Sequence, residues 1–295
     1  MSTDVGRRTV TVGVDGSDHA LRAVRWGAAE AGRRGTPLRL VTAFGWPGER
    51  PGGFRLDYHQ MLRGRAEAQL AQARAEALRV APCTEVEAEV VVGSPRAVLG
   101  AEARSAEVLV VGSRGFGRVE GLFAGSVGVA LAAGAPCPVV VVRGEERDPG
   151  EEQRLPVVVG VDGATWSEEA IAFAFDAAAS RGVELVAVHV WHEVAAPFGY
   201  DPFADPAAVA DEELRALDGR LAEHLSRWAG KHPDVPVRRV LVRGRPAPRL
   251  LEQAQQAQLV VVGSHGWGGF PGLVLGSVGN ALVHRAPCPV AVVRP

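Results

Sequence analysis

The stretch AEVLVVGSRGFGRVEGLFAGSVGVALAAGA, residues 106–135, places an apolar run, a glycine-rich segment and an alanine-rich run in direct succession. The first run is short and nearly continuous in apolar residues, which is typical of a strand buried on both faces. The last run, 126–135, is typical of a helix that begins directly after the glycines. A strand, a loop and a helix in this order form the unit from which parallel sheets are built.

The second half of the chain repeats the first. VLVVGSRG (108–115) recurs as LVVVGSHG (259–266) at an offset of 151, and TVGVDGS (11–17) recurs as VVGVDGA (158–164) at an offset of 147. Four residues inserted between the second and third strands of the second half account for the change. A period near 150 residues is too long for a solenoid, so it indicates domain duplication.

The charged segment RGEERDPGEEQRLP marks the boundary between the two copies. We expect one domain at 7–143, a linker at 144–155 and a second domain at 156–295. Strand-like runs alternate with helix-like runs in each half, which indicates a parallel sheet with helices on both faces. The predicted fold class is therefore α/β, with two tandem doubly wound domains, each built on a five-stranded parallel sheet. Ligands of such sheets bind beyond the carboxyl ends of the strands, where the strand order reverses.

The composition narrows the range of partners. The chain has 295 residues, a formal net charge of −2, and 47% hydrophobic residues. This balance predicts no nucleic-acid partner and no basic membrane-binding patch. No apolar stretch approaches the roughly 20 residues that span a bilayer, and the N-terminus lacks the features of a signal peptide. We therefore expect a cytoplasmic protein with no membrane partner.

Lysine is almost absent, because Lys231 is the only one in the chain. A phosphate-binding loop of the G-x-x-x-x-G-K-[ST] type therefore cannot be present. Mechanisms that need a positioned lysine are excluded for the same reason.

A carboxylate follows the first predicted strand of each half, at Asp15 and Asp162. Such a residue either shapes the turn or caps the following helix, or it accepts a hydrogen bond from a nucleoside. Ala43 and Val190 occupy matching positions late in the second strand, where small side chains would let a flat ring approach the backbone. Core packing explains them equally well.

The glycine-rich segments are the strongest functional signal. Gly112, Gly115, Gly125 and Ser126 have counterparts at identical spacing in Gly263, Gly266, Gly276 and Ser277. Glycines let backbone N–H groups come close to a ligand, and the first turn of the helix that follows can bind an anion such as phosphate without lysine. The alternative is a pair of tight turns, each with an N-cap serine. Two copies in register favour the phosphate site.

The pattern Gly-x2-Gly-x9-Gly-[Ser/Thr], with a first strand that ends in Val-Asp, resembles the nucleotide-binding class of universal stress proteins. The resemblance covers both halves, so the chain looks like a tandem universal stress protein of the actinobacterial type. It implies that the Asp and the small second-strand residue contact the nucleoside of ATP. The glycines and the Ser would surround the triphosphate, with Mg²⁺ or Mn²⁺ bridging the phosphates. The implied nucleotide-binding residues are Gly13, Val14, Asp15, Ala43, Gly112, Arg114, Gly115, Gly125, Ser126, Val127, Gly128, Gly160, Val161, Asp162, Val190, Gly263, His265, Gly266, Gly276, Ser277, Val278 and Gly279.

The two sites differ inside the loop, where Arg114 corresponds to His265. Arginine can add a charge-assisted phosphate contact that histidine makes only when it is protonated, so we expect unequal affinities. The long segments at 45–60 and 192–207 follow the second strand of each half. They act either as flaps over the sites or as plain surface connections.

We therefore expect an ATP-binding sensor or regulator of the stress response, with little or no hydrolysis. An ATP-cleaving enzyme on the same fold, either a slow ATPase or a nucleotidyl-transfer type, is the main alternative. A structural module with empty loops is the other. The last strands, PVVVVR (138–143) and PVAVVR (289–294), favour pairing of the two halves and association of two chains into a homodimer. A regulatory protein partner is expected but not identified.

Overall fold

The computed structural model describes residues 8–45, 55–115, 125–145, 148–162, 168–191, 206–264 and 275–294. These residues form one ten-stranded sheet in the order β3-β2-β1-β4-β5-β10-β9-β6-β7-β8. The strands are β1 Thr9–Gly13, β2 Leu38–Phe44, β3 Val86–Val92, β4 Ala106–Gly112, β5 Val139–Val142, β6 Val157–Val161, β7 Leu185–Trp191, β8 Val237–Arg243, β9 Leu259–Gly263 and β10 Val290–Val293.

Each half contributes five strands that pair in parallel throughout, which confirms the predicted fold class. Pairing of the two last strands joins the two five-stranded sheets into a single continuous one. The order 3-2-1-4-5 reverses between β1 and β4, and its counterpart reverses between β6 and β9. The carboxyl ends of these strand pairs are therefore where a ligand crevice is expected.

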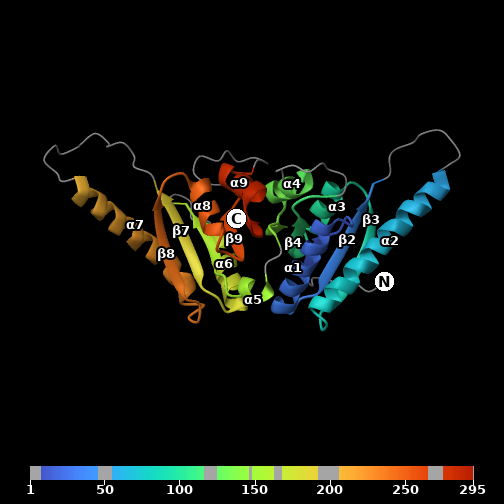
Figure 1. Ribbon diagram of the computed structural model, residues 1–295, viewed down its shortest axis with the longest axis horizontal. Helices are drawn as coiled ribbons and strands as arrows, with labels where there is room; N and C mark the ends of the chain where they lie inside the picture. Colours follow the sequence, from blue (N-terminus) through green and yellow to red (C-terminus); the bar gives the residue numbers. More distant parts are fainter. Residues whose placement is uncertain are drawn as a thin grey trace.

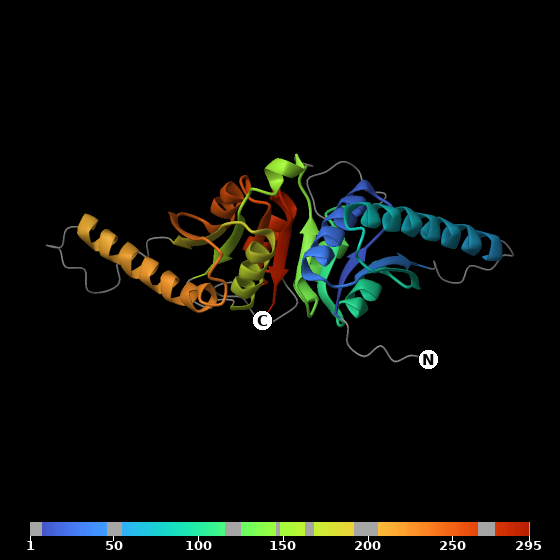
Figure 2. The ribbon, with the colours of Figure 1, turned by 90° about the horizontal axis from the view of Figure 1, so that it is seen from below.

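The helices cover both faces of the sheet (Figure 1). They are α1 Asp18–Arg34, α2 Arg55–Val80, α3 Pro95–Glu102, α4 Ser126–Gly134, α5 Pro149–Glu152, α6 Glu168–Arg181, α7 Pro206–Ala229, α8 Pro246–Ala254 and α9 Ser277–Arg285. One apolar core joins α1, α2, α6 and α7 to the sheet, and a second core joins α3, α4, α8 and α9 to the opposite face. α2 and α7 extend outward at the two far ends of the molecule (Figure 2).

Local sequence explains where these elements begin and end. Ser17 accepts a hydrogen bond from the Ala20 N–H at 3.1 Å and so caps α1. Gly35 ends the same helix in the left-handed conformation, at φ 63°. α3 begins with a proline, which suits the first turn of a helix, and ends at Glu102. In the described part of the chain, no helix combines the length and apolar character needed to cross a membrane.

The two halves meet along β5 and β10, which lie side by side at the centre of Figure 2. They pair antiparallel, and Val140 is opposite Ala291. These two residues are separated by the repeat offset of 151, so the pair lies on a pseudo-twofold axis between the halves. The expectation that the last strands pair the halves is confirmed.

Side chains at the ends of these strands reach across the junction in both directions. Arg143 donates a hydrogen bond to the Val283 carbonyl in α9, and Arg294 donates to the Ala133 carbonyl in α4 at 2.5 Å. Each arginine therefore binds the carboxyl-terminal end of a helix from the other half, where a cation is favoured.

Candidate functional site

The carboxyl ends of β1 and β4 bring the predicted carboxylate and the first loop glycines together. A methyl group added at Gly115 would lie 2.6 Å from Asp15 Oδ2, so the two residues are in contact. Asp15 follows β1 and Gly115 follows β4, and these strands are neighbours at the point where the strand order reverses. The first predicted site thus lies in the expected crevice.

Asp15 also shapes the turn into α1. Its Oδ1 accepts hydrogen bonds from the Ser17 N–H at 3.0 Å and from the Ser17 hydroxyl at 2.6 Å. Ser17 is the N-cap, so Asp15 positions the capping residue and does not cap the helix itself. The turn interpretation is therefore correct for Oδ1, while Oδ2 faces the glycine loop.

The glycine loops close in the same way in both halves. The Ser113 N–H donates to the Val142 carbonyl at 2.9 Å, and the Gly125 N–H donates to the Ser113 carbonyl at 2.7 Å. In the second half, the Ser264 N–H donates to the Val293 carbonyl at 2.8 Å, and the Gly276 N–H donates to the Ser264 carbonyl at 3.0 Å. All of these partners are related by the offset of 151. Each loop therefore begins and ends at one place, beside the last strand of its half.

Some of the predicted glycines are required by packing. A methyl group at Gly112 would lie 2.8 Å from the His19 backbone, and one at Gly13 would lie 2.8 Å from Leu99. Gly160, the counterpart of Gly13, meets Leu250 in the same manner at 2.9 Å. These three positions are explained by the close approach of a helix to the sheet.

Gly125 differs from that group. The nearest described atom to an added methyl group lies at 3.7 Å, and its φ of −60° suits any residue. Packing within the described residues therefore does not require glycine there. Gly125 is the N-cap residue of α4, a position where glycine is among the favoured residues.

The helices after the loops begin without side-chain caps. Gly125 and Gly276 occupy the N-cap positions, and neither α4 nor α9 has a side-chain hydrogen bond at its N-cap. Ser126 and Ser277 are the first helical residues, and both are exposed. The N-cap serine alternative is therefore wrong, because a glycine holds that position in each half. The first-turn amides, which include those of Val127, Gly128, Val278 and Gly279, lie at the end of the closed loop.

The small second-strand residues lie one strand away from the reversal point. Ala43 pairs in register with Val91 of β3, and Val190 pairs with Val242 of β8. Both are half-buried and pack against the core that contains α3, α4, α8 and α9. The structure places them at the carboxyl ends of β2 and β7, which pair with the strands that the two carboxylates follow.

The second site is described in part. Val161 ends β6, Asp162 follows it directly, and Gly263 ends β9 beside it. The buried ring of His189 approaches the Val161 carbonyl with Nδ1 at 3.0 Å. His265 and Gly266 lie outside the described residues. The same is true of 46–54 and 192–205, which hold most of the two flap candidates.

The sequence analysis missed a basic group beside the first site. His19 Nδ1 lies 3.4 Å from the Ser113 hydroxyl, and the Arg22 guanidinium contacts the same ring nitrogen. Arg22 also donates to the Gly144 carbonyl at 2.5 Å. Burial, and then the positive charges of Arg22 and Arg114, lower the pKa of His19 below its usual value. Helical spacing is the signal that could have revealed this group, because Asp18, His19 and Arg22 share the first turn of α1.

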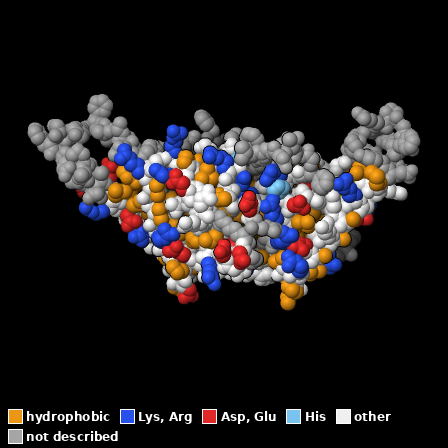
Figure 3. Space-filling model, viewed as in Figure 1, with side chains coloured by type: hydrophobic (Ala, Val, Ile, Leu, Met, Phe, Trp, Pro, Cys, Tyr) orange, Lys and Arg blue, Asp and Glu red, His pale blue; other side chains and the backbone are white. Residues whose placement is uncertain are grey.

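No carboxylate among the described residues lies within ion-pair distance of Arg22 or Arg143. Burial, and then the charge of Arg114, lowers the pKa of Arg143 to about 10. On the face drawn in Figure 3, basic side chains gather beside a histidine near the middle of the molecule, where the halves meet. The positions equivalent to His19 and Arg22 hold Trp166 and Glu169 in the second half, so the two sites differ in charge.

The described residues contain no group of three or more His, Cys, Asp or Glu side chains placed to hold a metal ion. A divalent cation that accompanies a nucleotide takes some of its ligands from the phosphate oxygens. Mg²⁺ commonly binds in this way, through substrate phosphates and one or two protein groups.

These features, two doubly wound halves with matching closed glycine loops, agree with the comparison with known families. The sequence model of the Universal stress protein family matches residues 6–143 and 154–294. The chain therefore belongs to the universal stress protein family and contains its domain twice, which confirms the resemblance inferred from the glycine pattern.

Close relatives show the same tandem organisation along their full length. The chain is 40% identical over 292 residues to a universal stress protein of Mycolicibacterium smegmatis, with 97% of each chain covered. It is also 40% identical over 303 residues to a universal stress protein of Mycobacterium tuberculosis, with 100% of this chain and 99% of the relative covered. The crystal structure of a universal stress protein from Archaeoglobus fulgidus superposes with a TM-score of 0.70 over 98% of both chains; at 18% identity this shows a shared fold.

Proposed function

We propose that this universal stress protein binds ATP at two sites, one in each half, and acts as a nucleotide-dependent sensor or regulator. The observation that carries the proposal is the closure of the glycine loops. The same two backbone hydrogen bonds close the loop in each half, and in each half a carboxylate follows the first strand. Asp15 and Asp162 would accept hydrogen bonds from the ribose, and Ala43 and Val190 would line the space for the adenine ring. The loop glycines and Ser126 or Ser277 would surround the phosphates.

Backbone amides supply the phosphate contacts in this proposal. The first turns of α4 and α9 have N–H groups without side-chain caps and carry the positive end of a helix dipole. This arrangement can bind an anion without lysine. The single lysine of the chain, Lys231, is far from both glycine loops in the sequence. Mg²⁺ or Mn²⁺ would bind together with the phosphates, and the exposed Ser126 hydroxyl would be available to it in the first half.

The first site should bind the triphosphate more tightly than the second. In the first half, Arg114 lies close enough to His19 to affect its charge, and His19 contacts Arg22, so positive groups gather there. The positions equivalent to Arg114, Arg22 and His19 hold His265, Glu169 and Trp166 in the second half. Phosphate oxygens gain more from arginine than from a neutral histidine. We propose that a difference in occupancy of the two sites is what a regulatory protein partner reads.

We propose binding with little or no hydrolysis, in the cytoplasm and as a homodimer. Cleavage of ATP by a slow ATPase or a nucleotidyl-transfer activity is the alternative. It would be recognised by ADP, or by AMP and pyrophosphate, after incubation of the protein with Mg-ATP.

The direct test is titration calorimetry with Mg-ATP on the intact chain. Gly125→Leu and Gly276→Leu each place a side chain where the phosphate would lie, and each should remove one of two binding events. Gly219→Leu is the matched control, because Gly219 has no atom within 4 Å of an added methyl group and lies on α7. Two intact binding events in both loop variants, or no heat in the unsubstituted protein, would overturn the proposal.

A further inference from the structure

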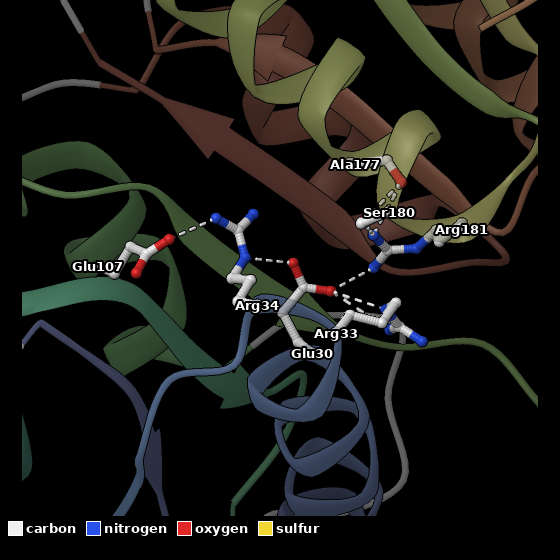
Figure 4. A network of polar contacts seen from close by, with 7 residues as sticks. All are labelled: Glu30, Arg33, Arg34, Glu107, Ala177, Ser180 and Arg181. Atoms are coloured by element: carbon white, nitrogen blue, oxygen red, sulfur yellow. Dashed lines mark hydrogen bonds and ion pairs between the residues drawn. The ribbon is translucent and has the colours of Figure 1, made fainter. Parts of the chain in front are cut away.

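A buried carboxylate lies between the two halves, on the face of the sheet that carries α1 and α6. Glu30 is fully buried and accepts contacts from three arginines (Figure 4). Its Oε1 lies 2.6 Å from Arg34 Nε, and its Oε2 lies 3.3 Å from Arg33 Nη2. Arg181 of the second half approaches the same Oε2 with Nη2 at 2.6 Å. One acid therefore serves arginines from both repeats.

The aromatic neighbours of this cluster follow the internal symmetry. The Arg34 guanidinium lies over the Phe173 ring at 5.3 Å, and the Arg181 guanidinium lies over the Trp26 ring at 5.6 Å. Phe173 and Arg181 each follow their counterparts Trp26 and Arg34 by 147 residues. Each half thus supplies one arginine, which lies over an aromatic ring of the other half. Each of these cation–π contacts contributes favourably to the free energy of folding.

The carboxylate breaks that symmetry. The position equivalent to Glu30 is Ala177, which is also fully buried. Arg181 finds the Ala177 carbonyl at 3.1 Å and the Ser180 hydroxyl at 3.4 Å within its own half. Arg34 has a second acid, because its Nη1 lies 2.6 Å from Glu107 Oε1. Among the described residues, Glu30 is the acid paired with Arg181.

This dependence matters because Arg181 is buried. Its side chain is 4% exposed, and an arginine without a nearby carboxylate is costly to hold away from water. Burial lowers the pKa of Arg181 to about 10 against the opposing effect of Glu30, so the guanidinium stays charged at neutral pH. An interface built from two C-terminal halves would enclose two such arginines and no equivalent of Glu30.

We infer that Glu30 determines which halves can pair across this interface. A C-terminal half fits an N-terminal half, either its own or that of a second copy of the chain, because that half brings the carboxylate. It does not fit another C-terminal half. Association of two chains that uses this surface of all four halves must therefore exchange unlike halves.

The test moves the carboxylate to the other repeat in the full chain. Glu30→Ala should lower the Tm by an amount on the order of 10 °C, because Arg181 loses its acid. Amides of β5 and β10 should also exchange hydrogen faster. Adding Ala177→Glu should restore much of both, since the new side chain enters the space that Glu30 vacates and lies four residues before Arg181, as Glu30 does before Arg34. Glu30→Ala with Ala179→Glu is the matched control, because Ala179 is exposed on the same helix and should restore neither.

A second measurement covers the case in which Ala177→Glu disrupts packing. Arg181→Met should lower the Tm of the unsubstituted chain but raise the Tm of the Glu30→Ala chain, because there it removes the orphaned charge. Equal rescue by Ala179→Glu would overturn the inference. So would a further fall in Tm when Arg181→Met is added to Glu30→Ala.

Discussion

The two sides of the junction between the halves join the same partners by different means. On one side, β5 and β10 pair through backbone hydrogen bonds that the pseudo-twofold axis repeats, with Val140 opposite Ala291. On the other side, α1 and α6 meet at two arginine–aromatic contacts that the axis also repeats, and at one carboxylate that has no counterpart in the second repeat. Backbone pairing accepts any two apolar strands, so it can be duplicated freely. A buried charge needs a specific partner, so it can distinguish one half from the other.

The helix side should be the more sensitive to the loss of one group. Glu30→Gln keeps the shape of the side chain and removes the charge, and it should cost about 3–5 kcal/mol of unfolding free energy at pH 7. Urea unfolding measures this. Glu76→Gln is the control, because Glu76 pairs with Arg25 and Arg79 at the surface and its loss should cost no more than about 1 kcal/mol.

Comparison of the natural chain with Glu30→Gln also predicts how the difference in stability changes with pH. Burial alone would raise the pKa of Glu30, but Arg181, Arg34 and Arg33 outweigh burial and hold the pKa below its ordinary value. A lowered pKa stabilises the fold above the ordinary glutamate value of about 4.3, and this contribution is lost as the pH falls through the lowered pKa. The gap in stability between the natural chain and Glu30→Gln should therefore be full at neutral pH and shrink in acid. A gap independent of pH from 7 to 3 would contradict the charge-based explanation.

The strand side can be broken at the point where the chain leaves β5. Gly144 has a φ of 90°, and an added methyl group would lie 2.1 Å from the Pro287 carbonyl oxygen of the second half. Gly144→Ala should cost about 2–4 kcal/mol, from left-handed strain and overpacking together. Gly182→Ala isolates the strain, because Gly182 has a φ of 64° and no atom within 4 Å, so about 1–2 kcal/mol is expected there. Equal losses in the two variants, measured by urea unfolding, would show that the Pro287 contact is not important.

The smallest expected effect concerns the two candidate nucleotide sites. In a chain that carries Gly276→Leu, ATP binding reports the first site alone. Arg114→His there should weaken binding by about 1 kcal/mol, roughly fivefold, and more at high pH than at low pH because histidine contributes only when protonated. Arg104→His is the control, since Arg104 is exposed near the opposite end of β4. Unchanged affinity in the Arg114 variant would remove the proposed basis for unequal sites.

Much of the site was accessible from the sequence because it depends on backbone geometry. The glycines and the apolar strands report local conformation, and duplication of the pattern indicated that the two loops end alike, as the closing hydrogen bonds of Gly125 and Gly276 do. His19 and Arg22 were missed because their relation to Ser113 and Gly144 depends on how α1 lies across β4 and β5. The sequence also did not show that Ser17 caps α1 and binds Oδ1 of Asp15, so that Oδ2 of Asp15 faces Gly115. This arrangement depends on the three-dimensional shape of the turn.

The sequence by itself determined the duplicated parallel fold and the place of the glycine loops, because hydrophobic periodicity and glycine are properties of short segments. Only the tertiary structure decided the antiparallel register in which β5 meets β10 and brought Glu30 to Arg181, which lies 151 residues further along the chain. Nothing in the local sequence marks Glu30 as buried, since a glutamate on α1 with two following arginines fits a solvated helix surface equally well. Its environment is created only when the second half packs against the first and removes water from the charge.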